Sequence, residues 1–137
     1  MDRKLILVLL LGLMLSGCQK EDRYGPRGRV TGKVTYEGQP VSEGAVSFFN
    51  AESSITTSGK LEADGSYTLM FAGSQDVPLG KYIVTVHPPS VSHEPGEAPP
   101  PQKEYPDIPF KYRERQTTDL TAEVEAKDQE FDFELGG

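Results

Sequence analysis

The sequence predicts an all-β protein, an antiparallel β-sandwich of seven strands, and three observations lead to this fold class. Apolar and polar residues alternate with a period of two in a series of short segments, which is typical of strands with one buried face. The 137 residues include 14 glycines and 11 prolines, and so many turn formers favour short strands over long helices. The second face of each expected strand is polar, whereas strands of parallel sheets are buried on both faces. Two antiparallel sheets packed face to face therefore fit the pattern best.

Seven segments carry the alternation. The expected strands, in chain order, are 29–36, 45–50, 55–61, 66–71, 81–86, 119–126 and 130–135. The side chains expected to face the core are Val30, Gly32, Val34, Tyr36, Val46, Phe48, Tyr67, Leu69, Phe71, Tyr82, Val84, Val86, Leu120, Ala122, Val124, Phe131, Phe133 and Leu135. Because a slip of one residue would expose these side chains, the alternation also fixes the register of each strand.

The connections between these segments have turn chemistry of their own. Residues 37–40, Glu-Gly-Gln-Pro, turn the chain after the first strand. The Asp-Gly pair at 64–65 tolerates positive φ and suits a tight turn. Residues 77–80, Val-Pro-Leu-Gly, are predicted to be another turn. In the last segment Asp132 and Glu134 are expected to face water, so their alternation is better explained by solvation than by catalysis.

The segment from Pro88 to Asp107 departs from the alternation and holds seven prolines. Loops of this length are uncommon inside a compact domain and are usually functional or disordered. Prolines favour the extended polyproline II backbone, which loses little entropy on binding, so the loop is a candidate contact for a partner. A tolerated surface insertion is the alternative interpretation. Ile108, Phe110 and Tyr112 are expected to hold the end of the loop on the sandwich.

The start of the chain has the pattern of a secretory signal. A basic pair at 3–4 precedes an apolar run over 5–15. This run is shorter than the roughly 20 residues that a membrane-spanning helix needs, and it has the length of the apolar part of a signal peptide. Small residues at 16–17 then precede Cys18, the only cysteine of the chain. A single cysteine cannot form an internal disulfide, and a buried structural cysteine is the alternative interpretation.

Residues 15–18, Leu-Ser-Gly-Cys, resemble the lipobox of bacterial lipoproteins. The resemblance implies that Cys18 receives a thioether-linked diacylglycerol, that the leader is cut between Gly17 and Cys18, and that the new amino terminus is acylated. Each buried methylene contributes about 0.8 kcal/mol, so two or three acyl chains hold a protein on a membrane where one barely would. Gln19, where inner-membrane retention signals have Asp, resembles the outer-membrane sorting pattern. The expected organisation is a signal peptide (1–17), a lipidated tether (18–27) and one domain (28–137).

Three stretches of the domain resemble the carboxypeptidase regulatory-like, or transthyretin-like, domain. They are "VTGKVTYEGQPVSEGAVSFFN" (30–50), "LEADGSYTL" (61–69) and "PLGKYIVTV" (78–86). The resemblance implies an immunoglobulin-like sandwich. The tail over 108–135 is similar to that of small lipoproteins with this domain that are numerous in planctomycetes. That family is mostly uncharacterised, and a fold by itself does not imply a function.

The search for catalytic chemistry yields one weak candidate. His87 and His93 are the only histidines, and Glu94 and Glu97 lie near them in the sequence. Imidazoles and a carboxylate can bind a divalent metal, but five intervening residues in a proline-rich loop impose no geometry. No G-x-S-x-G nucleophile motif and no glycine-rich phosphate loop is found in the sequence. We therefore predict no enzyme activity and no cofactor.

The formal net charge of -7 argues against a nucleic-acid partner, because phosphate binding needs clustered Lys and Arg. The predicted function is that of a membrane-anchored envelope lipoprotein, a non-enzymatic structural module or a module that contacts an envelope protein or glycan. The candidate contact residues are His87, His93 and Tyr105, in and beside the proline-rich loop. Two alternatives stay open: a metal-binding or catalytic periplasmic domain that uses His87 and His93, and a small-ligand carrier, which needs a sizeable pocket.

Overall fold

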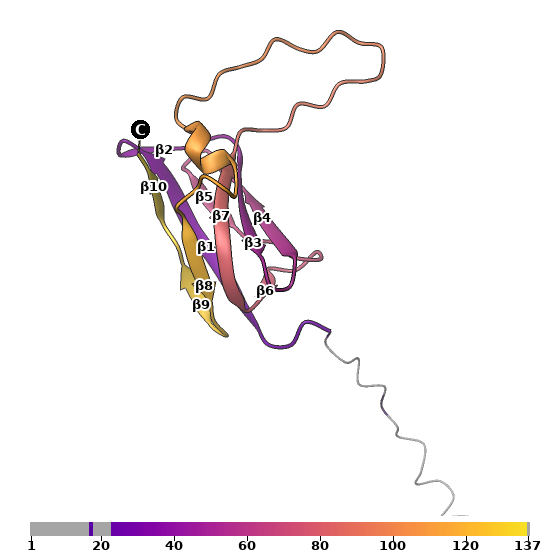
Figure 1. Ribbon diagram of the computed structural model, residues 1–137, viewed down its shortest axis with the longest axis vertical. Coiled ribbons are helices and arrows are strands. Elements are labelled where there is room, and N and C mark those ends of the chain that lie inside the picture. The colour runs from indigo at the N-terminus through magenta and orange to yellow at the C-terminus, as the bar shows by residue number, and fades with distance from the viewer. Residues whose placement is uncertain (1–16, 18–22, 137) are drawn as a thin grey trace, which may run out of the picture.

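The computed structural model describes Gly17 and residues 23–136. These residues form ten strands and one short 3₁₀ helix, η1 (Phe110–Arg113) (Figure 1). The strands are β1 (Arg27–Tyr36), β2 (Gln39–Pro40), β3 (Ala45–Asn50), β4 (Ile55–Lys60), β5 (Ser66–Thr68), β6 (Asp76–Pro78), β7 (Gly80–His87), β8 (Thr121–Val124), β9 (Asp128–Glu130) and β10 (Phe133–Leu135). The fold is therefore almost entirely β, as the alternation predicts.

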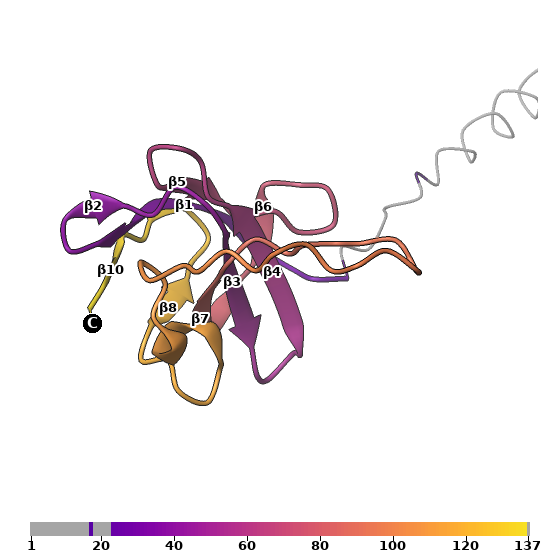
Figure 2. The ribbon, with the colours of Figure 1, turned by 90° about the horizontal axis from the view of Figure 1, so that it is seen from above.

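Two sheets pack against each other, which confirms the predicted β-sandwich (Figure 2). In the first sheet the long strand β1 is central. It pairs antiparallel with β6, β5 and β2 along one edge, and parallel with β9 and β10 along the other. The second sheet has the order β4-β3-β7-β8, and all its pairs are antiparallel. The parallel pairs of β1 differ from the purely antiparallel sheets that we predicted.

Several strand boundaries differ from the prediction, and two of these differences bear on the topology. The prediction of a turn over 77–80 is wrong, because Asp76–Pro78 form β6, where Val77 is fully buried and pairs with Gly28. The last segment is interrupted between β9 and β10, where the backbone N–H of Lys33 donates to Oδ1 of Asp132 over 2.8 Å. A side chain thus takes the place of one backbone acceptor, and one expected strand becomes two. Short pieces along β1 account for most of the increase from seven strands to ten.

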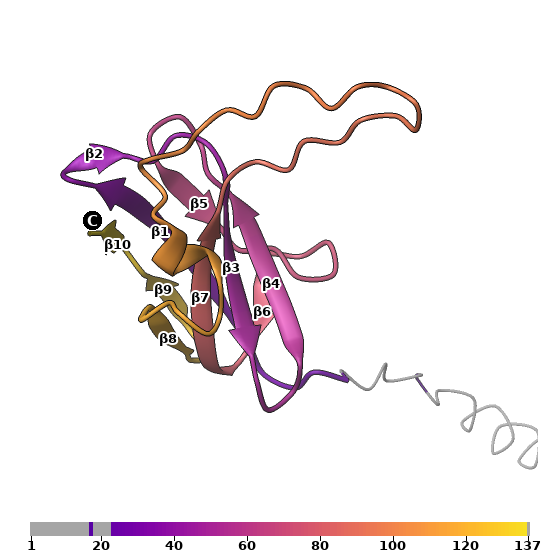
Figure 3. The same cartoon turned by 45° about the horizontal axis from the view of Figure 1, so that its top comes forward.

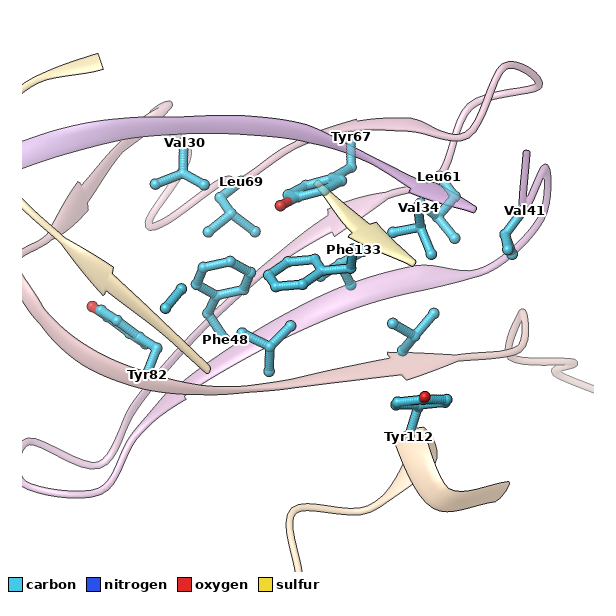
Figure 4. Packing of buried hydrophobic residues seen from close by; sticks show 14 of the residues in the cluster. Val30, Val34, Val41, Phe48, Leu61, Tyr67, Leu69, Tyr82, Tyr112 and Phe133 are labelled. Carbon is cyan, nitrogen blue, oxygen red and sulfur yellow. The ribbon is translucent and has the colours of Figure 1, made fainter. Parts of the chain in front are cut away.

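The core lies between the sheets and matches most of the predicted inward positions (Figure 4). Phe48 is fully buried at its centre, and its ring lies within 6.4 Å, centroid to centroid, of four other aromatic rings. These rings belong to Tyr67, Tyr82, Phe131 and Phe133. Tilted and edge-on aromatic pairs of this kind stabilise a core beyond the area that they bury. Four expected core residues are only partly buried, namely Tyr36, Phe71, Leu120 and Phe131.

The hydroxyl groups of two core tyrosines donate hydrogen bonds to backbone carbonyls. The hydroxyl of Tyr67 donates to the carbonyl oxygen of Phe131 over 2.6 Å, and that of Tyr82 donates to the carbonyl oxygen of Pro78 over 2.7 Å. Burial raises the pKa of both tyrosines above the usual value near 10, and the charges of Asp132 and Glu130 raise that of Tyr67 further. Both hydroxyls therefore stay protonated in the folded protein at alkaline pH.

These tyrosines predict an alkaline loss of stability. In the unfolded chain tyrosine ionises near pH 10, whereas the folded protein keeps both groups neutral to higher pH. A raised pKa contributes stability below pH 10 that is lost as the pH rises, so the free energy of unfolding should fall above pH 10. Tyr67→Phe should flatten this fall, at a cost of about 1 kcal/mol at neutral pH for the lost hydrogen bond. Urea unfolding between pH 8 and pH 11 tests this, and an unchanged slope in Tyr67→Phe would contradict it.

Candidate functional site

The anchor predicted from the sequence falls at the edge of the described chain. Cys18, the predicted lipidation residue, lies outside the described residues, as do residues 19–22 of the tether. Gly17, on the other side of the predicted cleavage point, is described and is exposed. Within the described part of the chain, no helix has the length and apolar character needed to cross a bilayer.

The described end of the tether packs on the sandwich. The ring of Tyr24 meets the ring of Phe71 edge-on, with centroids 4.9 Å apart. The Arg27 guanidinium lies 5.4 Å from the Tyr24 centroid and 5.8 Å from that of Phe71. Contacts between a guanidinium and aromatic faces are attractive because the ring face carries partial negative charge. The tether is therefore held against the domain from Tyr24 onward, at the end where β1 begins.

The proline-rich loop lies at the other end of the sandwich (Figure 3). It leaves the end of β7, extends away from the two sheets and returns to η1 (Figures 1 and 3). Residues 89–104 of the loop are all exposed. Strand β1, which follows the tether, begins at one end of the sandwich, and the candidate contact loop projects from the opposite end (Figure 1).

The base of the loop is fastened by a few specific contacts. Ile108 is fully buried and Tyr112 is nearly so, as predicted. The prediction that Phe110 also anchors the loop is wrong, because its side chain is 80% exposed. The Arg113 guanidinium donates from Nε to the carbonyl of Ile108 over 2.8 Å and from Nη2 to the carbonyl of Tyr105 over 3.0 Å. These hydrogen bonds satisfy backbone groups that the irregular loop leaves without a strand partner.

The three candidate contact residues lie in different surroundings. His87 ends β7, is partly buried, and its Nε2 is 2.7 Å from Oγ1 of Thr85. His93 is exposed within the loop, whereas Tyr105 is partly buried against the core at the base of the loop. No hydrogen bond or ion pair between described residues joins His87 to His93. The two histidines are therefore not held together as one site.

The electrostatic surroundings of His87 do not favour a cation. Burial lowers the pKa of His87, and the nearby positive charge of Arg113 lowers it further. A neutral imidazole can ligate a metal, but the described residues contain no group of three or more His, Cys, Asp or Glu side chains that could hold one. The metal-binding alternative thus has no ligand cluster in the described part of the chain.

A hollow that sequence reasoning missed lies on the outer face of the second sheet. We call it the arginine hollow; it has a volume of about 390 Å³ and is lined chiefly by Ser47, Phe49, Thr85, His87, Arg113 and Arg115. Strands β3 and β7 place the outward side chains Ser47 and Thr85 directly opposite each other in the sheet. Thr85 is only 3% exposed because η1 packs on β7 at this point. The basic residues at 113 and 115 are visible in the sequence, but nothing there shows that they meet β3.

Two larger hollows bear on the small-ligand alternative. One, of about 610 Å³, lies between the start of the proline-rich loop and the end of β4, beside Pro89, Lys60 and Leu61. The other, of about 600 Å³, lies beside Tyr82 and Phe131 at the β8 edge of the sandwich. Both volumes fall in the range of small-molecule sites. The small-ligand carrier therefore stays a prediction that binding experiments can test.

Comparison with known proteins places the chain in no established group. No protein-family model, no curated protein and no solved structure matches this chain.

Proposed function

We propose that this protein is an exported lipoprotein of the cell envelope, anchored through acyl chains on Cys18, whose β-sandwich serves as a non-enzymatic interaction module. The observation that carries the proposal is the Leu-Ser-Gly-Cys segment behind a basic pair and a short apolar run. Targeting and lipidation signals of this kind are recognised as linear sequence patterns, so the interpretation of this segment does not depend on the fold. The proposed location is the outer membrane, because Gln19 follows the cysteine.

The described fold supports this proposal in two respects. Among the described residues, the buried apolar side chains lie between Val30 and Leu135, so the core that they form does not depend on a leader ending at Gly17. Nine extended residues between Cys18 and the end of the tether would reach at most about 30 Å, which keeps the domain near its membrane. The proline-rich loop, at the end of the sandwich opposite the tether, would then face away from the lipid surface (Figure 1).

The resemblance to carboxypeptidase regulatory-like domains is part of the same proposal. Two glycine turns within the resembling stretches support it. Gly65, with φ of +79°, follows Asp64, whose Oδ1 accepts the backbone N–H of Ser66 over 3.0 Å. Gly80, with φ of +138°, begins β7 ahead of the buried Tyr82. We propose an envelope protein or glycan as the partner of this domain.

The decisive test is the chemical state of the amino terminus. The protein, expressed in a Gram-negative host, should yield an amino-terminal peptide that begins at Cys18 and carries thioether-linked diacylglycerol and a further acyl group. Cys18→Ser should retain the leader and give no acylated peptide. Gln19→Asp is the matched control, which should keep the acyl groups and move the protein from the outer to the inner membrane fraction.

Three results would overturn parts of the proposal. Mass spectrometry that finds no fatty acid on the wild-type protein would remove the anchor. Recovery of the wild-type protein in a detergent-free soluble fraction with an uncut leader would do the same. Catalytic turnover of a substrate by the purified protein, lost on substitution of His87, would replace the non-enzymatic role.

A further inference from the structure

The arginine hollow has the size of a small-molecule site. Its volume of about 390 Å³ lies in the lower part of the range of ligand pockets. It is formed by two parts of the chain, the outer face of β3, β4 and β7, and the segment 113–116, which begins at the last residue of η1. Both parts are held in place, the first by the sheet and the second by the packing of Tyr112 into the core.

Both guanidinium groups of the hollow are held against aromatic rings. Cζ of Arg115 lies 4.0 Å from the centroid of the Phe49 ring, and Cζ of Arg113 lies 4.2 Å from that of Phe110. Arg113 is fixed further by its hydrogen bonds to the carbonyls of Tyr105 and Ile108. A guanidinium that stacks on a ring still directs its remaining N–H groups outward in its own plane, where they can bind a carboxylate through two hydrogen bonds.

These two arginines also lack ion-pair partners in the described part of the chain. The ion pairs found there use Arg29, Lys103, Lys111 and Lys127 instead. Glu114 lines the hollow as well, but it pairs with neither arginine. The hollow therefore keeps a net positive charge in a protein whose formal net charge is -7. Such a local excess of positive charge favours an anionic ligand.

The rest of the lining is rich in hydrogen-bonding groups rather than apolar ones. Ser47, Thr56 and Thr85, which carry hydroxyl groups, and Gln116, which carries an amide, line the hollow together with the two arginines. His87 adds an imidazole whose Nε2 is bonded to Thr85. Donors and acceptors at this density suit a ligand with many hydroxyl groups, whereas an apolar ligand would leave them without partners.

We propose that the arginine hollow binds a carboxylate-bearing sugar unit, with Arg113 and Arg115 on the carboxylate and the side-chain hydroxyls and Gln116 on the sugar hydroxyls. The inference names the partner class of the interaction module and so rests on the proposed function. The partner is an acidic saccharide. The helix η1, whose last residue Arg113 lines the hollow, follows the proline-rich loop in the chain (Figure 3).

The test is a titration of the full-length protein, purified in detergent, with sodium glucuronate, followed by amide shifts in heteronuclear NMR spectra. Glucuronate should shift the amides that line the hollow, and glucose should bind at least about tenfold more weakly because it lacks the carboxylate. Arg115→Gln should weaken glucuronate binding by about tenfold or more, and Arg115→Lys should fall between the two. Arg29→Gln is the matched control, since Arg29 forms an ion pair with Asp76 on the first sheet. The affinity of this variant for glucuronate should equal that of the wild-type protein.

Three outcomes would overturn this inference. The first is the absence of shifts at the hollow at any glucuronate concentration. The second is equal binding of acetate or inorganic phosphate, which would mark a simple anion site. The third is unchanged glucuronate affinity in Arg115→Gln. None of these outcomes bears on the acyl groups of Cys18, and a missing acyl group would not alter glucuronate binding. Failure of this inference can therefore be distinguished from failure of the anchor proposal.

Discussion

Replacing Gly32 by alanine is expected to lower the free energy of unfolding by about 3 kcal/mol or more, which is large for the addition of one methyl group. A Cβ atom at this position would lie 1.9 Å from the carbonyl oxygen of Phe131 and 2.9 Å from the hydroxyl of Tyr67. That carbonyl accepts the Tyr67 hydrogen bond at the junction between β9 and β10. The methyl group would therefore push the last two strands away from β1 and break a buried hydrogen bond.

The matched control for this prediction is Gly38→Ala. Gly38 has φ of +79°, but nothing lies within 4 Å of the Cβ that alanine would add. That change should cost only about 1–2 kcal/mol, the penalty of a left-handed backbone for a residue with a side chain. Urea unfolding followed by circular dichroism measures both variants. A loss in Gly32→Ala no larger than that in Gly38→Ala would show that β9 and β10 do not approach β1 this closely.

Truncation of Phe48 to alanine is expected to cost about 3–5 kcal/mol. The side chain is fully buried, and it is the ring that the four other core aromatic rings share. Its removal leaves a cavity between the sheets and also ends the aromatic contacts, which contribute beyond the area that they bury. In a sandwich of this size such a loss is a large part of the total stability, so unfolding at 37 °C is expected.

Phe110→Ala provides the control, because it removes the same side chain from a position that is 80% exposed. This variant should change the free energy of unfolding by no more than about 0.5 kcal/mol. The midpoints of urea unfolding, recorded at neutral pH for both variants, give the comparison. Similar midpoints in the two variants would mean that Phe48 does not occupy the centre of the core.

The candidate site could be predicted only in part from the sequence. The buried residues at the base of the proline-rich loop, Ile108 and Tyr112, follow from their apolar character between polar neighbours. Arg113 and Arg115 gave no such signal, because charged residues in a connection are usually solvated. Arg115 stacks on Phe49, which lies more than sixty positions earlier in the chain, and the two meet because η1 packs on β7. Contacts between distant segments leave no local pattern.

The anchor proposal has the opposite character. Its signal is a short linear segment that ends at Cys18, and it needs no partner elsewhere in the chain. Signals of this kind are recognised as linear sequence patterns, so tertiary structure adds nothing to their recognition. The contact between Tyr24 and Phe71 is a separate observation. It shows the point at which the tether begins to pack on the domain. The chemistry at Cys18 therefore rests on the amino-terminal mass measurement alone.

Alternation of apolar and polar residues was enough to determine most of the side chains that enter the core, because successive residues of a strand point to opposite faces. It could not reveal which strands are neighbours or in which direction they run. Strand pairing depends on two segments at once, and the alternation within one strand does not identify the strand with which it pairs. Only the folded chain shows that β9 and β10 run parallel to β1 and that Val77 belongs to a strand. It also shows that Asp132, between β9 and β10, accepts a hydrogen bond from the backbone N–H of Lys33. These features depend on contacts between residues far apart in the chain, whereas the burial pattern is a property of each strand by itself.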